Sequence, residues 1–108
     1  MQPTSEWTDK DCAILDDLLL RMSGKYSINL LAILTLYGEK SFGDLKRDLA
    51  PISAKVLTDS LNQLVANGFI HNRKVTEGNV KRSYYTIADR DRFMPVLRAL
   101  RAFATPLI

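Results

Sequence analysis

The feature that most constrains the fold is a change in the hydrophobic period of the sequence at Asn67-Gly68. Before this point, apolar residues recur at the spacing of helices. After it, segments 69–75 and 81–87 carry the residue types of strands, and a turn cluster at 77–79 separates them. The sequence therefore predicts a set of helices followed by one β-hairpin.

Start and stop signals divide the part before the hairpin into four helices. The first spans 9–22, the second 26–37, the third runs from Ser41 to the residue before Pro51, and the fourth spans 54–67; a fifth helix begins at 89 or 90 and contains Pro95. Asp9, Ser41 and Ser53 are expected to cap the first, third and fourth helices. The fourth helix is expected to bury Val56, Leu57, Leu61, Leu64 and Val65.

Length and composition fit one small globular domain. The chain has 108 residues, of which 46% are hydrophobic and 25% charged, and it has a single cysteine, so an internal disulfide framework is excluded. We expect a flexible arm over 1–8, with Trp7 packed on the first helix, and one domain over 9–108. The longest wholly apolar run, 30–34, is far too short to span a bilayer, and the acidic start is unlike a signal peptide. A soluble, cytoplasmic protein with no membrane partner is predicted.

The net charge of +3 hides an uneven distribution. Residues 1–24 hold two basic and five acidic side chains, whereas 25–108 hold the other 13 basic and seven acidic ones. A basic body suggests a polyanionic partner, although an ordinary solvated surface would have the same composition. Four of the bases lie on the last helix, where they would either face solvent or lie on the dimer side, opposite the acidic residues of the first helix.

The order of the elements points to a winged helix-turn-helix. Two amphipathic helices joined by Ala50-Pro51-Ile52 are followed directly by the hairpin, and a helix of this kind fits the major groove of DNA. Basic residues flank the hairpin turn, and they would either contact DNA or protect the edge of the sheet from aggregation. The fold class predicted is α+β, mainly α, with terminal helices that flank the winged helix.

We expect two groups of DNA-binding residues. The phosphate contacts are assigned to Lys46, Arg47, Lys55, Lys74, Lys81 and Arg82. The residues expected to touch or approach base edges are Ser53, Ala54, Thr58, Asp59 and Asn62. Only Lys55 is basic among the outward residues of the fourth helix, and Asp59 opposes phosphate binding.

The terminal helices carry more apolar surface than one small core needs. The expected dimer interface consists of Ile14, Leu15, Leu18, Leu19, Phe93, Leu97, Leu100 and Phe103. The alternative is that these side chains simply cover the core of the single chain.

Enzymatic and metal-binding motifs are absent from the sequence. There is no glycine-rich phosphate loop, no nucleophile elbow and no Cys/His ligand spacing around His71, the only histidine. Asp16 and Asp17 are adjacent on a helix, so their side chains diverge. We therefore expect no catalytic site, no metal and no cofactor.

Several loose motifs occur together in a specific order. They are Cys12, Ser23-Gly24-Lys25-Tyr26, the segments 38–46, 52–58 and 68–70, Tyr85-Thr86-Ile87 and Met94-Pro95-Val96-Leu97. Over 12–103 the chain resembles the HxlR-type winged helix-turn-helix transcriptional regulators, relatives of the MarR-like regulators. It departs from their pattern at Ala13 and Tyr26, which replace proline and tryptophan, and it lacks a glycine within 88–92 and a proline at the wing tip.

The resemblance implies a homodimer that binds pseudo-palindromic, double-stranded operator DNA through the fourth helix and the wing. It also implies an oxidant-sensing role for Cys12. The alternative is that Cys12 is a passive, buried thiol. The chain would alternatively serve as a winged-helix module for protein–protein contact in a transcription assembly. A small-molecule effector, bound between the terminal helices and the wing, is compatible with the first interpretation.

Overall fold

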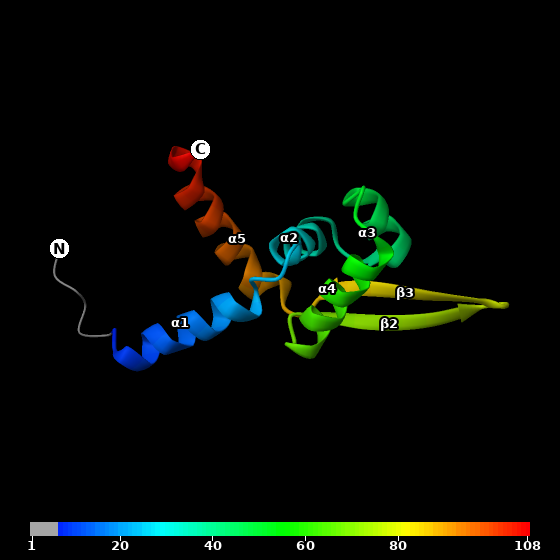
Figure 1. The fold of residues 1–108 in the computed structure, drawn as a ribbon, viewed down its shortest axis with the longest axis horizontal. Coiled ribbons are helices and arrows are strands. Elements are labelled where there is room, and N and C mark those ends of the chain that lie inside the picture. Colours follow the sequence, from blue (N-terminus) through cyan, green and yellow to red (C-terminus); the bar gives the residue numbers. More distant parts are fainter. Residues whose placement is uncertain (1–6) are drawn as a thin grey trace.

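The computed structural model describes residues 7–108, so most of the predicted arm lies outside the described residues. The elements follow in the order α1 (Asp9–Arg21), α2 (Ser27–Tyr37), β1 (Lys40–Ser41), α3 (Phe42–Asp48), α4 (Ala54–Ala66), β2 (Ile70–Glu77), β3 (Val80–Ile87), α5 (Arg90–Ala104) and the 3-10 turn η1 (Thr105–Leu107). Within residues 7–108, five α-helices and a small antiparallel sheet confirm the winged helix-turn-helix fold (Figure 1).

Side-chain caps explain where the helices begin. Ser41 Oγ accepts from the backbone N–H of Asp44, and Ser53 Oγ accepts from that of Val56, both at 3.1 Å, so these two predicted caps are confirmed. Asp9 as the cap of α1 is wrong. Thr8 caps α1 in a capping box with Asp11, which leaves Asp9 as the first residue of the helix.

The core lies between α2, α3, α4 and the base of the sheet. Its fully buried apolar side chains are Leu30, Leu31, Leu34, Leu45, Leu57, Leu61, Leu64 and Ile70. Val56 and Val65, which the periodicity assigned to the core, are 38% and 37% exposed because the buried stripe of α4 is narrower than predicted. Trp7 is 59% exposed, so its expected packing on α1 is also wrong.

The sheet is antiparallel with the strand order β1-β3-β2. β2 and β3 pair over their whole length, from Ile70 with Ile87 to Glu77 with Val80, so the turn is only Gly78-Asn79. Gly78 has φ of 61°, a left-handed conformation that glycine adopts without strain. β1 was not predicted, and it places the start of α3 beside β3 through the pairing of Ser41 with Tyr84.

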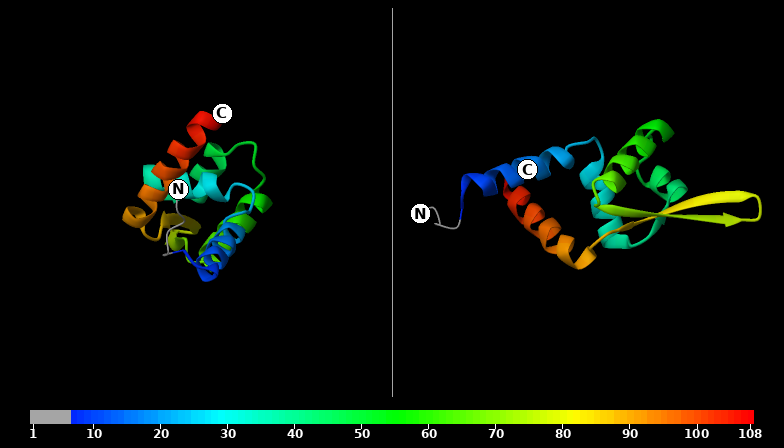
Figure 2. Two further views of the ribbon diagram at one scale, coloured as in Figure 1. Left: turned by 90° about the vertical axis from the view of Figure 1, so that its left-hand side faces the viewer. Right: turned by 90° about the horizontal axis from the view of Figure 1, so that it is seen from below.

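The terminal helices project from this core. Neither α1 nor α5 contains a buried residue, and both leave the body at the end opposite the hairpin (Figures 1 and 2). The Cα radius of gyration is 16.4 Å. A compact domain of this length would have a value of about 13 Å. The single chain is therefore elongated, with most of α1 and α5 outside its core.

One hydrogen bond and one aromatic side chain hold the start of α5 to the core. Arg90 Nε donates to the carbonyl oxygen of Thr35 at 2.8 Å, which satisfies one of the last carbonyls of α2. Phe93 is partly buried against the core cluster. Phe93 therefore helps to cover the core of the single chain.

Candidate nucleic-acid interface

The outward face of α4 presents the residues that the sequence assigned to DNA. Ala54, Lys55, Thr58, Asp59 and Asn62 are all exposed, whereas Leu57, Leu61 and Leu64 of the same helix are buried. Ser53 is exposed as well, and its hydroxyl oxygen is engaged in the helix cap. The helix thus offers a polar surface with three hydroxyl or amide side chains that are able to hydrogen-bond to base edges.

The formal charge of this α4 face is neutralised internally. Lys55 Nζ lies 2.9 Å from Asp59 Oδ2, one turn further along the helix. This hydrogen bond and the charge of Asp59 raise the pKa of Lys55. Asp59, a residue expected to oppose phosphate binding, is thus paired with the only base of this face.

The strand register separates the bases of the hairpin onto two faces. Lys74 pairs with Ser83 and Lys81 with Thr76, so both lysines lie on one face. Arg73 pairs with Tyr84 and Arg82 with Val75, which places both arginines on the other face. Within residues 7–108, neither lysine makes an ion pair.

Both arginines of the hairpin have acidic partners. Arg73 donates to both oxygens of Glu39, at 2.8 and 3.2 Å, and its guanidinium lies 4.8 Å from the centre of the Tyr84 ring. The hydrogen bond from Arg73 lowers the pKa of Glu39. Arg82 Nε lies 4.0 Å from Glu77 Oε2. The face of the hairpin with free positive charge is therefore the lysine face.

A groove of about 440 Å³ lies between the start of α3 and β3. It brings together three of the predicted phosphate-binding residues, Arg47, Lys81 and Arg82. Arg47 pairs with Asp44, whose pKa is lowered by the hydrogen bond with Ser41 and by Arg47. Lys46 and Lys55 are exposed outside this groove.

Sequence reasoning missed the hydroxyl side chains of the groove. Ser41 and Ser83 line it beside the bases. Their proximity depends on the pairing of β1 with β3, and a strand of two residues leaves no periodic signal in a sequence. The only local signal was Ser41 itself, which was recognised as a helix cap.

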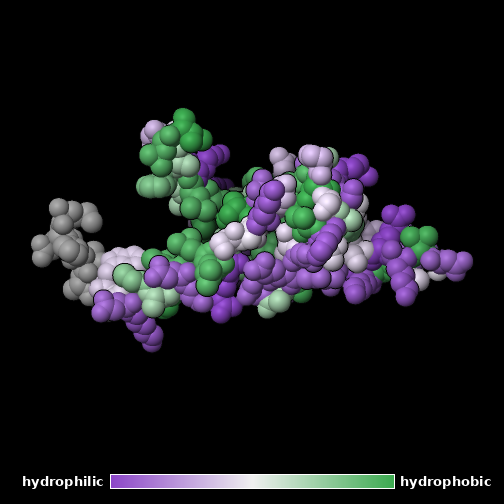
Figure 3. Space-filling model, in the orientation of Figure 1, coloured by the Kyte–Doolittle hydropathy of each residue, from purple (hydrophilic) through white to green (hydrophobic). Residues whose placement is uncertain are grey.

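The predicted dimer residues lie on α1 and α5. Ile14, Leu15, Leu18, Leu19, Leu100 and Phe103 are exposed in the single chain, whereas Leu97 and Phe93 are half-buried. In Figure 3, apolar surface covers much of α5 and continues onto the neighbouring part of α1. The arrangement leaves a large apolar surface outside the core of the single chain.

Cys12 is exposed on α1, so the expectation of a buried thiol is wrong for the single chain. It lies one turn before Leu15 and two turns before Leu19, and therefore borders the same apolar stripe.

A second hollow, of about 310 Å³, lies between the terminal helices and the end of the sheet. Leu18 of α1, Met22 just after it, Phe93 and Val96 of α5, and Ile87 of β3 are among the side chains that line it. The charged residues Asp89 and Arg92 also line it.

Among residues 7–108, no three His, Cys, Asp or Glu side chains gather in a way that would hold a metal ion. No helix in this range is long and apolar enough to cross a membrane.

Comparison with known proteins assigns the fold to a family. The sequence profile of the HxlR-like helix-turn-helix family matches residues 21–108. Among curated proteins, no match to the sequence was found.

Three solved structures illustrate the likeness. A transcriptional regulator of the MarR family from Enterococcus faecalis V583 is 27% identical, with a TM-score of 0.78 over 97% of this chain and 94% of the other. The HTH-type transcriptional regulator ytcD is also 27% identical, with a TM-score of 0.76 over 85% and 93%. The reduced redox regulator HypR shares the fold at 19% identity, with a TM-score of 0.74 over 85% and 90%. The chain belongs to the HxlR-like helix-turn-helix family, and its relatives among solved structures are transcriptional regulators.

Proposed function

We propose that this chain regulates transcription as a homodimer that binds pseudo-palindromic operator DNA through α4 and the β2–β3 hairpin. The observation that carries the proposal is the separation of two surfaces along the long axis. Exposed polar and basic side chains lie on α4 and the hairpin, and exposed apolar side chains lie on α1 and α5 at the other end.

The apolar surface supports the homodimer. Leu19 and Phe103 are 64% and 72% exposed, and such contiguous surface is unfavourable in water unless a partner covers it. A two-fold dimer buries the same patch on both subunits and needs no other protein. The same symmetry would present two copies of α4 to successive turns of the major groove, about 34–36 Å apart.

The DNA contacts divide by chemistry. Thr58 and Asn62, with Ser53 and Ala54, would approach base edges from the exposed face of α4. Phosphate contacts would come from Lys46, Arg47, Lys74, Lys81 and Arg82, and from Lys55 when it leaves Asp59. Since several of these bases already have acidic partners, we propose moderate, salt-sensitive affinity.

Selection from a random pool of double-stranded DNA tests the DNA-binding part. The expected result is an inverted repeat whose half-site centres lie about one DNA turn apart. Binding that is absent at every salt concentration would contradict the proposal and favour the alternative, a winged helix used for protein–protein contact.

Sedimentation analysis of two matched variants tests the dimer. Leu19 and Leu20 are both exposed on α1, but adjacent residues on a helix point about 100° apart, and only Leu19 belongs to the apolar stripe. Leu19→Glu should convert the dimer to a monomer, and Leu20→Glu should leave it dimeric. A wild-type protein that is monomeric at high concentration would contradict the proposed dimer.

We also propose that the hollow between α1, α5 and β3 binds a small, mainly apolar effector. Its largely apolar walls support this class of ligand, and its charged lining residues, Asp89 and Arg92, are of opposite sign. 2-Naphthol is a suitable probe, and it should raise the melting temperature of the wild type but not of a Val96→Trp variant, which fills the hollow. An equal shift in both proteins would contradict the site.

A further inference from the structure

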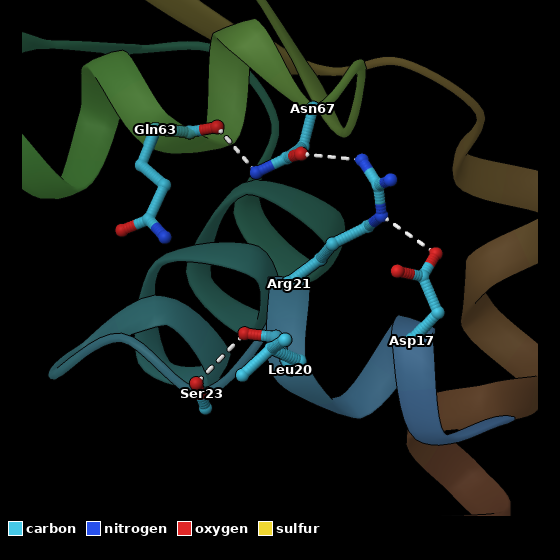
Figure 4. A network of polar contacts seen from close by, with 6 residues as sticks. All are labelled: Asp17, Leu20, Arg21, Ser23, Gln63 and Asn67. Carbon is cyan, nitrogen blue, oxygen red and sulfur yellow. Dashed lines mark hydrogen bonds and ion pairs between the residues drawn. The ribbon is translucent and has the colours of Figure 1, made fainter. Parts of the chain in front are cut away.

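Arg21, the last residue of α1, connects this helix to the end of α4. Its Nε donates to Asp17 Oδ2 and its Nη1 donates to Asn67 Oδ1, both at 2.8 Å (Figure 4). Asn67 in turn donates from Nδ2 to the carbonyl oxygen of Gln63 at 3.0 Å, which orients its amide oxygen toward Arg21. The guanidinium is thus held at two points, one on each helix.

A second contact joins the α1–α2 connection to α4 further back along the helix. Ser60 Oγ, on the buried side of α4, donates to the carbonyl oxygen of Lys25 at 3.1 Å. Between the two contacts, Gly24 lies beside the side chain of Gln63 on α4: a Cβ atom added at Gly24 would lie 3.1 Å from Gln63 Oε1 and 2.9 Å from Ser27 Oγ. Ser60 and Asn67 are two helical turns apart, so the connection is fixed along about 10 Å of α4.

Few other interactions fix the direction of α1. The helix has no buried residue, and Met22, immediately after it, is where the chain enters the core. Within residues 7–108, Arg21 makes the only side-chain hydrogen bond from α1 to another helix. The angle between α1 and α4 is therefore not imposed by apolar packing along α1.

We infer that Arg21 and Asn67, together with the Ser60–Lys25 contact, form a clamp. This clamp sets the distance between the two copies of α4 in the dimer. The inference rests on the proposed function, in which α1 lies at the dimer interface and α4 in the major groove. Arg21 is a positioning residue in this scheme. It touches no DNA, but it determines which half-site spacing the dimer accepts.

A small rotation of α1 at the clamp would cause a large displacement at the far end of this helix. α1 has 13 residues and is about 20 Å long. A rotation of about 10° at Arg21 would move its far end by about 3.4 Å, which equals the rise of one base pair. Because the side chains of Arg21 and Asp17 are about half exposed, the ion pair itself adds little to stability, so its loss should alter geometry and leave the fold intact.

The experiment measures affinity for a series of duplexes with identical half-sites and spacers of different length, and for a single half-site. The wild type should prefer one spacer. Arg21→Ala and Asn67→Ala should each bring the affinity ratio between that spacer and its neighbours toward unity, with half-site affinity unchanged. The double variant should add nothing to either single variant, because both remove the same contact.

Two further variants separate geometry from charge. Lys10→Ala removes a positive charge from an exposed position on the same helix and should keep the wild-type preference. Arg21→Lys, which is still able to donate to Asn67, should restore part of it. A wild-type spacer preference in Arg21→Ala, or equal losses on single and paired half-sites, would overturn the clamp. A wild type that binds single and paired half-sites alike would overturn the proposed dimer on its operator, and the clamp with it.

Discussion

Lys55 and Asp59 form an ion pair on the outward face of α4, with Nζ 2.9 Å from Oδ2. Both side chains are well exposed, at 84% and 63%, so the pair competes with solvent and is weak. On approach to DNA, the lysine would exchange the carboxylate for a phosphate, while the carboxylate would be repelled. In the proposed mode of binding, Asp59 would therefore disfavour non-specific binding by this helix.

We predict that Asp59→Asn strengthens binding to non-specific DNA and steepens its salt dependence. Lys55 would be free for one more phosphate contact, which changes the slope of log K against log salt by about 0.9. Fluorescence anisotropy at several salt concentrations measures this slope. Asp16→Asn, on α1, is the matched control with the same change in charge, and equal slopes in the two variants would contradict the prediction.

The two faces of the hairpin should contribute unequally to DNA binding. Lys81→Ala should reduce the magnitude of the salt slope by about 0.9, the value for one lost phosphate contact. Arg82→Ala should have a smaller effect because Glu77, at 4.0 Å, already neutralises part of its charge. The same anisotropy titration compares them, with Lys10→Ala as the control, and a double variant with the wild-type slope would exclude the hairpin from the interface.

Thr58→Ala should alter specificity rather than general affinity. Thr58 is exposed on α4 and carries no charge, so its loss leaves the phosphate contacts intact. We expect discrimination at one base pair of each half-site to fall by about 1 kcal/mol, or about fivefold. Selection from a random DNA pool, run in parallel with the wild type, detects this, and identical base preferences would argue against a base contact.

Cys12 should report on dimer formation. It borders the apolar stripe of α1 one turn from Leu15, so a second subunit that covers the stripe would also shield the thiol. The rate of alkylation by iodoacetamide should fall as protein concentration rises. Leu19→Glu should abolish this dependence, and a rate that is the same at every concentration in the wild type would mean that Cys12 lies outside the interface.

The local signals of the sequence were sufficient for most of the fold. Ser41 and Ser53 were recognised as caps because a hydroxyl that accepts from the third residue of a helix is a local interaction. The change of period at Asn67-Gly68 located the hairpin for the same reason. The error at Asp9 is local as well, since Thr8 competes for the cap. The error at Val56 is tertiary, because the width of a buried stripe depends on what packs against it.

The candidate interface was predicted only as a set of residues. Periodicity identified the outward positions of α4, and turn residues identified the bases of the hairpin. The sequence pattern did not show which bases of the hairpin share a face, because that depends on the strand register. In the structure, Arg73 and Arg82 lie on one face and have acidic partners. Lys74 and Lys81 lie on the other face. Nor did the sequence pattern link Arg47 to Lys81, which come together through β1.

The sequence by itself therefore determined the order of the main helices and the hairpin, the exposed face of α4 and the presence of apolar stripes at both ends of the chain. These follow from interactions within a few residues, which period and composition record. Only the tertiary structure decided which charges are neutralised, and that Arg21 meets Asn67, 46 positions further along the chain. Such contacts depend on how elements pack in space, and the free energy of one polar contact is too small to leave a pattern in the sequence.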